Sequence, residues 1–306
     1  MSLSRRSVLK AVAAASASSL ATKASPTDAR AAVAEAPPSA VGMLYDATRC
    51  IGCKACMGAC NAANDVTPDT RASGGVWHAP LDLNEHAKNI IKLYRDPASG
   101  EQSYVKRQCM HCLDPACATA CMLGAYQKRE RGIVSYDPSL CIGCRYCEMA
   151  CPFNVPKFEW SKAAPKMVKC ELCKERVAEG KEPACCEVCP VDAVIFGLRS
   201  ELLAEAHKRI EEHPDRYLHH VYGEHEAGGT QVLYLSHVPF EKLGLPAYDD
   251  RPVPETVRTV QHSIYRGFVA PVALYASLVG VLLRNRRANA GVAGVATRDD
   301  DEEEST

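Results

Sequence analysis

Short apolar stretches separated by polar turns run through most of this chain, and they predict strands and short helices. The predicted strands cover 42–46, 90–94, 104–106, 133–136 and 193–197. Short helices are expected beside several of the cysteines, at 57–63 and 148–150. Because short strands and short helices alternate without a long repeating pattern, the predicted fold class is α+β.

A longer amphipathic pattern follows the last of these strands. It predicts a helix over 200–212, with Ser200 as its N-cap and Leu203, Ala206 and Ile210 on one face. The next residues, up to 262, are rich in proline, histidine and glycine and have few periodic apolar positions. We therefore expect 200–262 to be a helix followed by an irregular segment that contacts other subunits.

An uncharged apolar run of 17 residues lies near the C-terminal end, at 267–283. It predicts a single transmembrane helix over 264–284, because a span needs about 20 residues and no second apolar helix is available to cover it. The alternative is a buried core helix. Three arginines follow the run and favour a cytoplasmic location for 285–306, an acidic tail predicted to be disordered: Arg284, Arg286 and Arg287.

The first residues have the pattern of a twin-arginine export signal. Arg5 and Arg6 precede Val8, Leu9 and Lys10, and an alanine-rich stretch follows. This route carries folded proteins that already hold their cofactors. The signal is recognised by a receptor and does not anchor the protein in the membrane. We expect 1–31 to be the signal region and the rest of the protein to lie at the periplasmic face of the cytoplasmic membrane, as the arginines after the apolar run also indicate.

The candidate chemistry is in the cysteines. Sixteen of the 17 form four groups of four, and Cys186 is left over. The groups are Cys50, Cys53, Cys56 and Cys60; Cys109, Cys112, Cys117 and Cys121; Cys141, Cys144, Cys147 and Cys151; and Cys170, Cys173, Cys185 and Cys189.

The third group has the spacing C-x2-C-x2-C-x3-C-P, which is typical of [4Fe–4S] binding in bacterial ferredoxins. The first group repeats the spacing, with Asn61 in place of the proline. Gly52 and Gly143 stand where the loop must turn. Structural zinc and a disulfide framework are the alternatives, but neither requires this spacing four times in one chain. The sequence therefore predicts four [4Fe–4S] clusters.

In two-cluster ferredoxins the fourth cysteine of each group binds the other cluster. Applied to the two inner groups and then to the two outer groups, this exchange predicts two nested dicluster modules within 42–199. Set 1 is Cys50, Cys53, Cys56 and Cys189; set 2 is Cys109, Cys112, Cys117 and Cys151; set 3 is Cys121, Cys141, Cys144 and Cys147; set 4 is Cys60, Cys170, Cys173 and Cys185.

Length and charge narrow the function further. The chain has 306 residues and a net charge of −1, which gives no electrostatic reason to expect nucleic-acid binding. We find no nucleophile, paired-carboxylate or phosphate-loop motif, so the chain is predicted to transfer electrons without catalysing a reaction itself.

From about residue 42 to 246 the chain resembles the iron–sulfur subunits of formate dehydrogenase and dimethyl sulfoxide reductase type complexes. It resembles most the ferredoxin-like component of hydrogenase-2 type uptake [NiFe] hydrogenases, the HybA type. The stretches that carry this resemblance are GMLYDATRCIGCKAC, QCMHCLDPAC, CRYCEMACPFNVPKFEW, KCELC, EVCPVDAVIFG and YGEHEAGGTQVLYLSHVPFEKLGLP. Met122 stands where the second group lacks a proline, and the loop near 213–222 looks short for the family.

The resemblance implies that electrons from hydrogen oxidation pass from the small and large hydrogenase subunits, through four clusters, to a quinone-reactive integral membrane subunit. Two alternatives remain. One is the iron–sulfur subunit of a formate dehydrogenase or another molybdopterin oxidoreductase, and the other is a zinc-binding interaction module.

Overall fold

The computed structural model describes residues 35–69, 80–255 and 269–293. The predicted signal region, the end of the acidic tail and residues 264–268 of the expected membrane helix lie outside these ranges. Every cysteine lies inside them.

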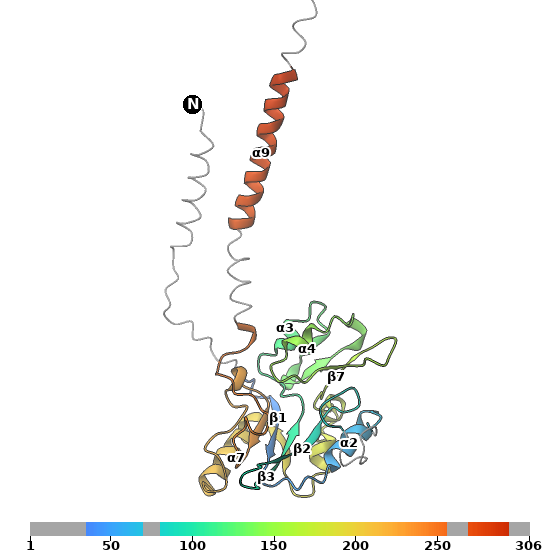
Figure 1. Cartoon of the computed structure of the whole chain (residues 1–306), viewed down its shortest axis with the longest axis vertical. Helices are drawn as coiled ribbons and strands as arrows, with labels where there is room; N and C mark the ends of the chain where they lie inside the picture. The colour runs from blue at the N-terminus through green and yellow to red at the C-terminus, as the bar shows by residue number, and fades with distance from the viewer. Residues whose placement is uncertain (1–34, 70–79, 256–268, 294–306) are drawn as a thin grey trace, which may run out of the picture.

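A three-stranded sheet stands at the base of the described fold (Figure 1). Strand β1 (Val41–Asp46) pairs antiparallel with β8 (Val194–Leu198) and parallel with β9 (Val232–Leu235). All six residues of β1 are buried, because helix α7 (Arg199–Glu212) covers one face of the sheet and the cysteine loops cover the other. Leu44 packs toward α7, whereas Met43 and Tyr45 pack among the cysteines, as the two-residue period of a strand requires.

Two short hairpins lie on either side of the cysteine loops. Strands β2 (Ile90–Arg95) and β3 (Gln102–Arg107) form one, and β4 (Tyr126–Lys128) pairs with β5 (Val134–Tyr136) in the other. A two-residue pair, β6 (Lys157–Phe158) and β7 (Met167–Val168), adds a further edge.

The remaining helices are short and follow or contain cysteines. They are α2 (Ala55–Ala63), α3 (Ala116–Thr119), α4 (Tyr146–Ala150), α5 (Lys174–Ala178) and α6 (Ala184–Glu187), with single 3-10 turns at Glu130–Gly132, Pro138–Leu140 and Glu226–Gly228. Helix α2 packs on α6, and α3 packs on α4. These two helix pairs define two lobes, one around α2 and the sheet and one around α3, α4 and β7 (Figure 1).

The predicted strands and helices are present, with differences in detail. Helix α7 begins at Arg199, and Leu198 rather than Ser200 occupies the N-cap position, with no side-chain hydrogen bond. Leu202 is buried together with Ala206 and Ile210, whereas Leu203 is half-buried. The segment after α7, which is predicted to be irregular, contains the strand β9.

Asp46 ties this region together at the end of β1. Its carboxylate is fully buried and accepts hydrogen bonds from Arg209 on α7 at 3.2 Å and from the Tyr217 hydroxyl at 2.8 Å. Thr48 donates to the other carboxylate oxygen from both its backbone and its hydroxyl. The end of β1, α7 and the chain after α7 therefore share one buried charge.

The long helix α9 (Val269–Ala293) is drawn apart from the cysteine-bearing lobes in Figure 1, and large apolar side chains along it, such as Leu274 and Leu282, are exposed. Across the described residues, none of the helices combines the length and the apolarity needed to cross a membrane. The membrane helix expected over 264–284 is therefore not confirmed by the structure.

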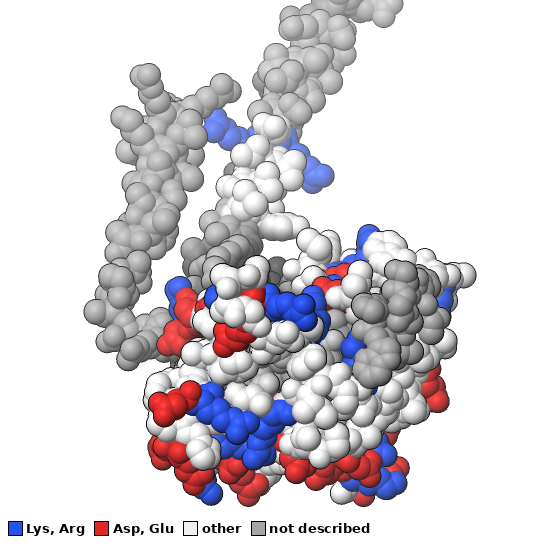
Figure 2. Space-filling model, turned by 60° about the horizontal axis from the view of Figure 1, so that its bottom comes forward, with Lys and Arg blue, Asp and Glu red and all other residues white. Residues whose placement is uncertain are grey.

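The surface carries both signs of charge. Figure 2 shows Lys and Arg side chains mixed with Asp and Glu over one face, with uncharged surface between them. This mixture agrees with the net charge of −1.

Candidate iron–sulfur site

All 17 cysteines are free thiols, so a disulfide framework does not hold this fold together. Nor do the described residues bring three or more Cys, His, Asp or Glu side chains close enough to hold a single metal ion. The cysteines of two predicted sets instead line cavities together with apolar side chains.

Four cysteines line one cavity beside the end of β1. Cys50, Cys53 and Cys56 come from the loop that leads into α2, and Cys189 comes from the turn after α6. These are the members of predicted set 1. Burial raises the pKa of the Cys56 thiol to about 12, with Cys50 and Cys53 contributing. Thiols in this environment lose their protons only when a cation compensates them, as iron does.

A second cavity is lined by the four cysteines of predicted set 4, Cys60, Cys170, Cys173 and Cys185. It is formed where α2 packs on α6. Burial raises the pKa of the Cys60 thiol to about 11, and Cys185 and Cys173 add to that shift.

Cys185 and Cys186 are both buried on α6, but they differ in the space that they line. Cys185 lines the second cavity, whereas Cys186 does not. Helices α3 and α6 also begin in the same way, with Pro-Ala-Cys at 115–117 and at 183–185. Cys185 therefore occupies the position that corresponds to Cys117, four residues before the last cysteine of its group.

The cysteines of predicted set 2 also lie close to one another. Burial raises the pKa of Cys112 well above its usual value, and the thiols of Cys109, Cys151 and Cys117 add to this effect. Cys109 and Cys117 are buried, and Cys112 and Cys151 are half-buried.

Predicted set 3 lies in the lobe of α3, α4 and β7, and like set 1 it has one buried, two half-buried and one exposed cysteine. Burial raises the pKa of Cys147 to about 11, and Cys141 and Cys121 lie close enough to contribute. Cys144, the remaining member, is exposed on the same loop as Cys141, just before α4. The structure thus brings three members of this set together and leaves the fourth at the surface.

Backbone amides point at cysteine sulfur atoms in several of these loops. Ala125 N donates to Cys121 Sγ at 3.2 Å, and Ala193 N donates to Cys189 Sγ at 3.3 Å. Gly143 N and Leu172 N each donate, at 3.4 Å, to the cysteine two residues earlier. Such bonds stabilise thiolate ligands and tune the potential of a bound cluster. Four thiols around one cavity, apolar walls and amide donors together fit [4Fe–4S] binding.

The first and third cysteine loops have the same backbone. Gly52 and Gly143 have φ angles of 69° and 74°, and Lys54 and Arg145, two residues later, have φ angles of 59° and 62°. Lys54 and Arg145 are the N-cap residues of α2 and α4. The repeat in the sequence is therefore a repeat in structure.

Gly52 and Gly143 differ in the space available for a side chain, so the same substitution should affect them differently. Alanine at either position incurs about 1–2 kcal/mol of backbone strain. At Gly52 the added carbon would also lie 2.3 Å from Tyr104 Cε1, whereas at Gly143 its nearest neighbour is Phe158 at 3.5 Å. We expect Gly52→Ala to lose substantially more iron than Gly143→Ala, measured as iron per chain after anaerobic purification. Equal iron loss from the two variants would contradict this account.

The four sets are arranged in a row. Cys56 of set 1 lies near Cys185 of set 4, Cys170 of set 4 lies near Cys109 of set 2, and Cys117 of set 2 lies near Cys147 of set 3. The spatial order is thus 1, 4, 2, 3, so that the outer module and the inner module meet between sets 4 and 2.

Asn64, which sequence reasoning missed, contacts two cysteines of set 4. Its Nδ2 donates to the Cys60 backbone oxygen at 2.8 Å and to Cys60 Sγ at 3.7 Å, and it lies 4.0 Å from Cys173 Sγ. Lys88 Nζ donates to its Oδ1 at 2.9 Å. Lys88 polarises the amide, which strengthens the donor that faces sulfur. An asparagine four residues after the last cysteine of a group is the signal that could have identified it.

We expect Asn64→Leu to lower the potential of the cluster on set 4 by roughly 50 mV, close to a tenfold change in a one-electron equilibrium. The reason is that a donor to sulfur favours the more negative, reduced form. Asn61→Leu, three residues earlier on α2, is the control, and potentiometric titration followed by electron paramagnetic resonance is the measurement. An unchanged potential in Asn64→Leu would refute the role of this amide.

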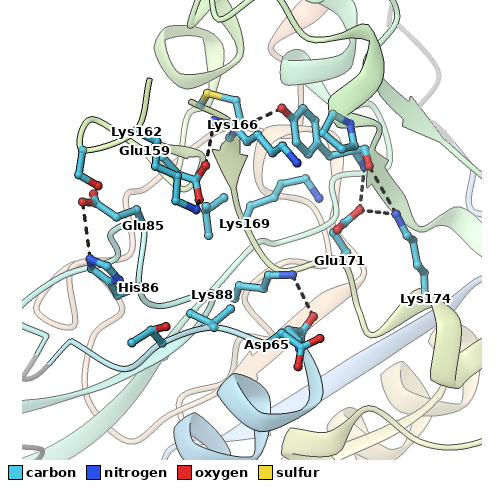
Figure 3. Close-up of a pocket in the computed structure, with 18 residues that line it drawn as sticks. Asp65, Glu85, His86, Lys88, Glu159, Lys162, Lys166, Lys169, Glu171 and Lys174 are labelled. Atoms are coloured by element: carbon cyan, nitrogen blue, oxygen red, sulfur yellow. Dashed lines mark hydrogen bonds and ion pairs between the residues drawn. The ribbon is translucent and has the colours of Figure 1, made fainter. Parts of the chain in front are cut away.

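A wide cleft lies between the loop after α2 and the β6–β7 edge, and it shares Asn64, Lys88 and Glu171 with the set 4 cavity (Figure 3). Lysines and carboxylates line it, and many are paired with each other. Glu159 pairs with Lys162, and Glu171 pairs with Lys174. Glu171 also accepts a hydrogen bond from Tyr136 N. These contacts connect the loops that line the cleft, and we assign them a structural role.

Comparisons with known proteins agree with this site. Residues 101–199 match the family described as 4Fe-4S dicluster domain. The chain is 40% identical to hydrogenase-2 operon protein HybA of Escherichia coli O157:H7, over 93% of this chain and 96% of that protein. It is 34% identical to the nitrate-inducible formate dehydrogenase iron-sulfur subunit of Escherichia coli K12, over 86% of this chain and 89% of that subunit.

Proposed function

This chain belongs to the family that contains hydrogenase-2 operon protein HybA and the formate dehydrogenase iron–sulfur subunits, and on that premise we propose its specific function. It is the electron-transfer subunit of a membrane-bound uptake [NiFe] hydrogenase. It relays electrons from hydrogen oxidation to a quinone-reactive membrane subunit. The catalytic chemistry belongs to its partners.

The observation that carries this proposal is the row of four cysteine sets. When bound, each [4Fe–4S] cluster supplies a centre that accepts and releases one electron. Set 1 would use Cys50, Cys53, Cys56 and Cys189; set 2 Cys109, Cys112, Cys117 and Cys151; set 3 Cys121, Cys141, Cys144 and Cys147; and set 4 Cys60, Cys170, Cys173 and Cys185. The fold places neighbouring sets side by side and surrounds most of them with apolar side chains, which keeps water away.

The two ends of the row are suited to docking partners. Exposed apolar side chains lie next to set 1, at Ile51 and Val188, and next to set 3, at Ile142 and Met149. Exposed apolar residues grouped in this way favour protein contacts. We propose that one end meets the hydrogenase small and large subunits and the other meets the quinone-reactive subunit.

The function is tested by following electrons in membranes that contain or lack this chain. With the chain present, hydrogen should reduce both an artificial dye and quinone, and the hydrogenase subunits should copurify from detergent extracts. Without it, dye reduction should persist and quinone reduction should be lost. Quinone reduction that persists without the chain would reject the proposal.

A formate dehydrogenase partner is the second candidate, because one relative at 34% identity is such a subunit. The same copurification distinguishes the two. A molybdopterin subunit in place of the hydrogenase subunits would assign the chain to that class.

We further propose that the protein is exported by the twin-arginine route and held at the periplasmic face of the membrane by a helix over 264–284, with residues 285–306 in the cytoplasm. The sequence patterns at both ends support this location. Replacing Arg5 and Arg6 by lysine should leave the protein in the cytoplasmic fraction. Normal export of that variant would reject the signal.

A further inference from the structure

A lysine is completely buried among the cysteines. Lys106 lies on β3, and none of its surface is exposed. Burying a lysine is costly unless its ammonium group is compensated, so its position requires an explanation. Nothing in the proposed ligand sets accounts for it.

Lys106 Nζ donates to Gln108 Oε1, which leaves its charge uncompensated. The amide of Gln108 is held in turn, because its Nε2 donates to Met43 Sδ at 3.2 Å. Among the described residues, no carboxylate forms an ion pair with Lys106. The groups that face its charge are cysteine thiols.

Those cysteines belong to two different sets. Lys106 lies close to Cys185, Cys170 and Cys60, all of set 4, and it also lies close to Cys56 of set 1. It lines the set 1 cavity itself.

We propose that Lys106 is a fixed cation between the clusters on sets 1 and 4 that raises the reduction potentials of both. The proposal rests on the electron-transfer function given above. An electron added to either cluster makes it more negative, and a nearby positive charge in a low-dielectric interior stabilises that reduced state. The same charge offsets the repulsion between two neighbouring reduced clusters. Lys106 thus adjusts the cluster potentials through its charge and is not a cluster ligand.

A merely structural lysine would leave a different signature. If Lys106 served only to fill space and bond Gln108, a neutral side chain of similar length would leave the potentials unchanged. If it were needed only to assemble the clusters, neutral variants would lose iron. An electrostatic role instead predicts intact clusters with shifted potentials.

The experiment compares Lys106→Met and Lys106→Gln with the unaltered protein, each purified anaerobically in its complex. Lys208→Met is the matched control, because Lys208 is an exposed lysine on α7 that pairs with Glu212 and lies outside the cysteine sets. Iron content and electron paramagnetic resonance during a redox titration are measured. We expect full iron content and a downward shift of two midpoint potentials, with the other two unchanged.

Other outcomes would overturn the inference. They are unchanged potentials, an equal shift of all four, or loss of iron from both neutral variants. Failure of the proposed function would look different, because the unaltered protein would then show no iron–sulfur signals at all.

Discussion

Replacing Cys170 with alanine should abolish electron transfer from hydrogen to quinone through this chain while leaving about three-quarters of its iron in place. Cys170 is buried in set 4 and lies near Cys109 of set 2, where the two modules meet. Without a cluster at this junction, set 1 is separated from sets 2 and 3. Dye reduction by the catalytic subunits should persist, quinone reduction should fall to background, and iron should fall from about 16 to about 12 atoms per chain.

Cys186→Ala is the matched control for this change. Cys186 is as buried as Cys170 and adjoins Cys185, but it lines neither cysteine cavity. Its variant should keep all the iron and the full rate of quinone reduction. If Cys186→Ala loses a cluster and Cys170→Ala does not, the assignment of set 4 is wrong.

Asp46→Ala should produce the largest loss of stability. It would remove the carboxylate that Arg209 and Tyr217 share and leave the nearly buried Arg209 guanidinium with Glu205 as its remaining ion-pair partner. Breaking a buried ion pair in this way costs about 3–5 kcal/mol. In a protein of this size that cost should lower the Tm by roughly 10 °C, measured anaerobically at a fixed heating rate.

The control for this change is Asp215→Ala, because Asp215 is exposed and lies in the same region between α7 and β9. Its Tm should stay close to that of the unaltered protein. A similar small effect from both variants would mean that Asp46 does not tie β1 to α7.

The loops of the first and third cysteine groups could be predicted closely from the sequence, because their backbone conformation depends on residues within each loop. Gly52 and Gly143 provide the positive φ angles, and α2 and α4 start at the same place after them. The strand β1 could also be predicted, since the five residues before Asp46 carry no polar side chain except the Tyr45 hydroxyl and all are buried.

The features that the sequence analysis missed depend on contacts between distant residues. Strand β9 is four residues long in a stretch rich in glycine and histidine, and it forms because β1 offers it a parallel edge. The sequence predicts Lys106 only as the end of a strand, because nothing nearby in sequence shows that thiols from three other segments lie around it. Short helices α3 and α6 have too few residues to show a period, although the proline before each is a local signal.

The central claim is that the sixteen cysteines of sets 1 to 4 hold four [4Fe–4S] clusters. The most direct test is the iron and acid-labile sulfide content of the anaerobically purified protein, together with electron paramagnetic resonance of its reduced form. The account predicts about 16 iron and 16 sulfide per chain and signals from interacting reduced clusters. A protein that contains zinc, lacks sulfide and gives no paramagnetic iron signal would contradict it.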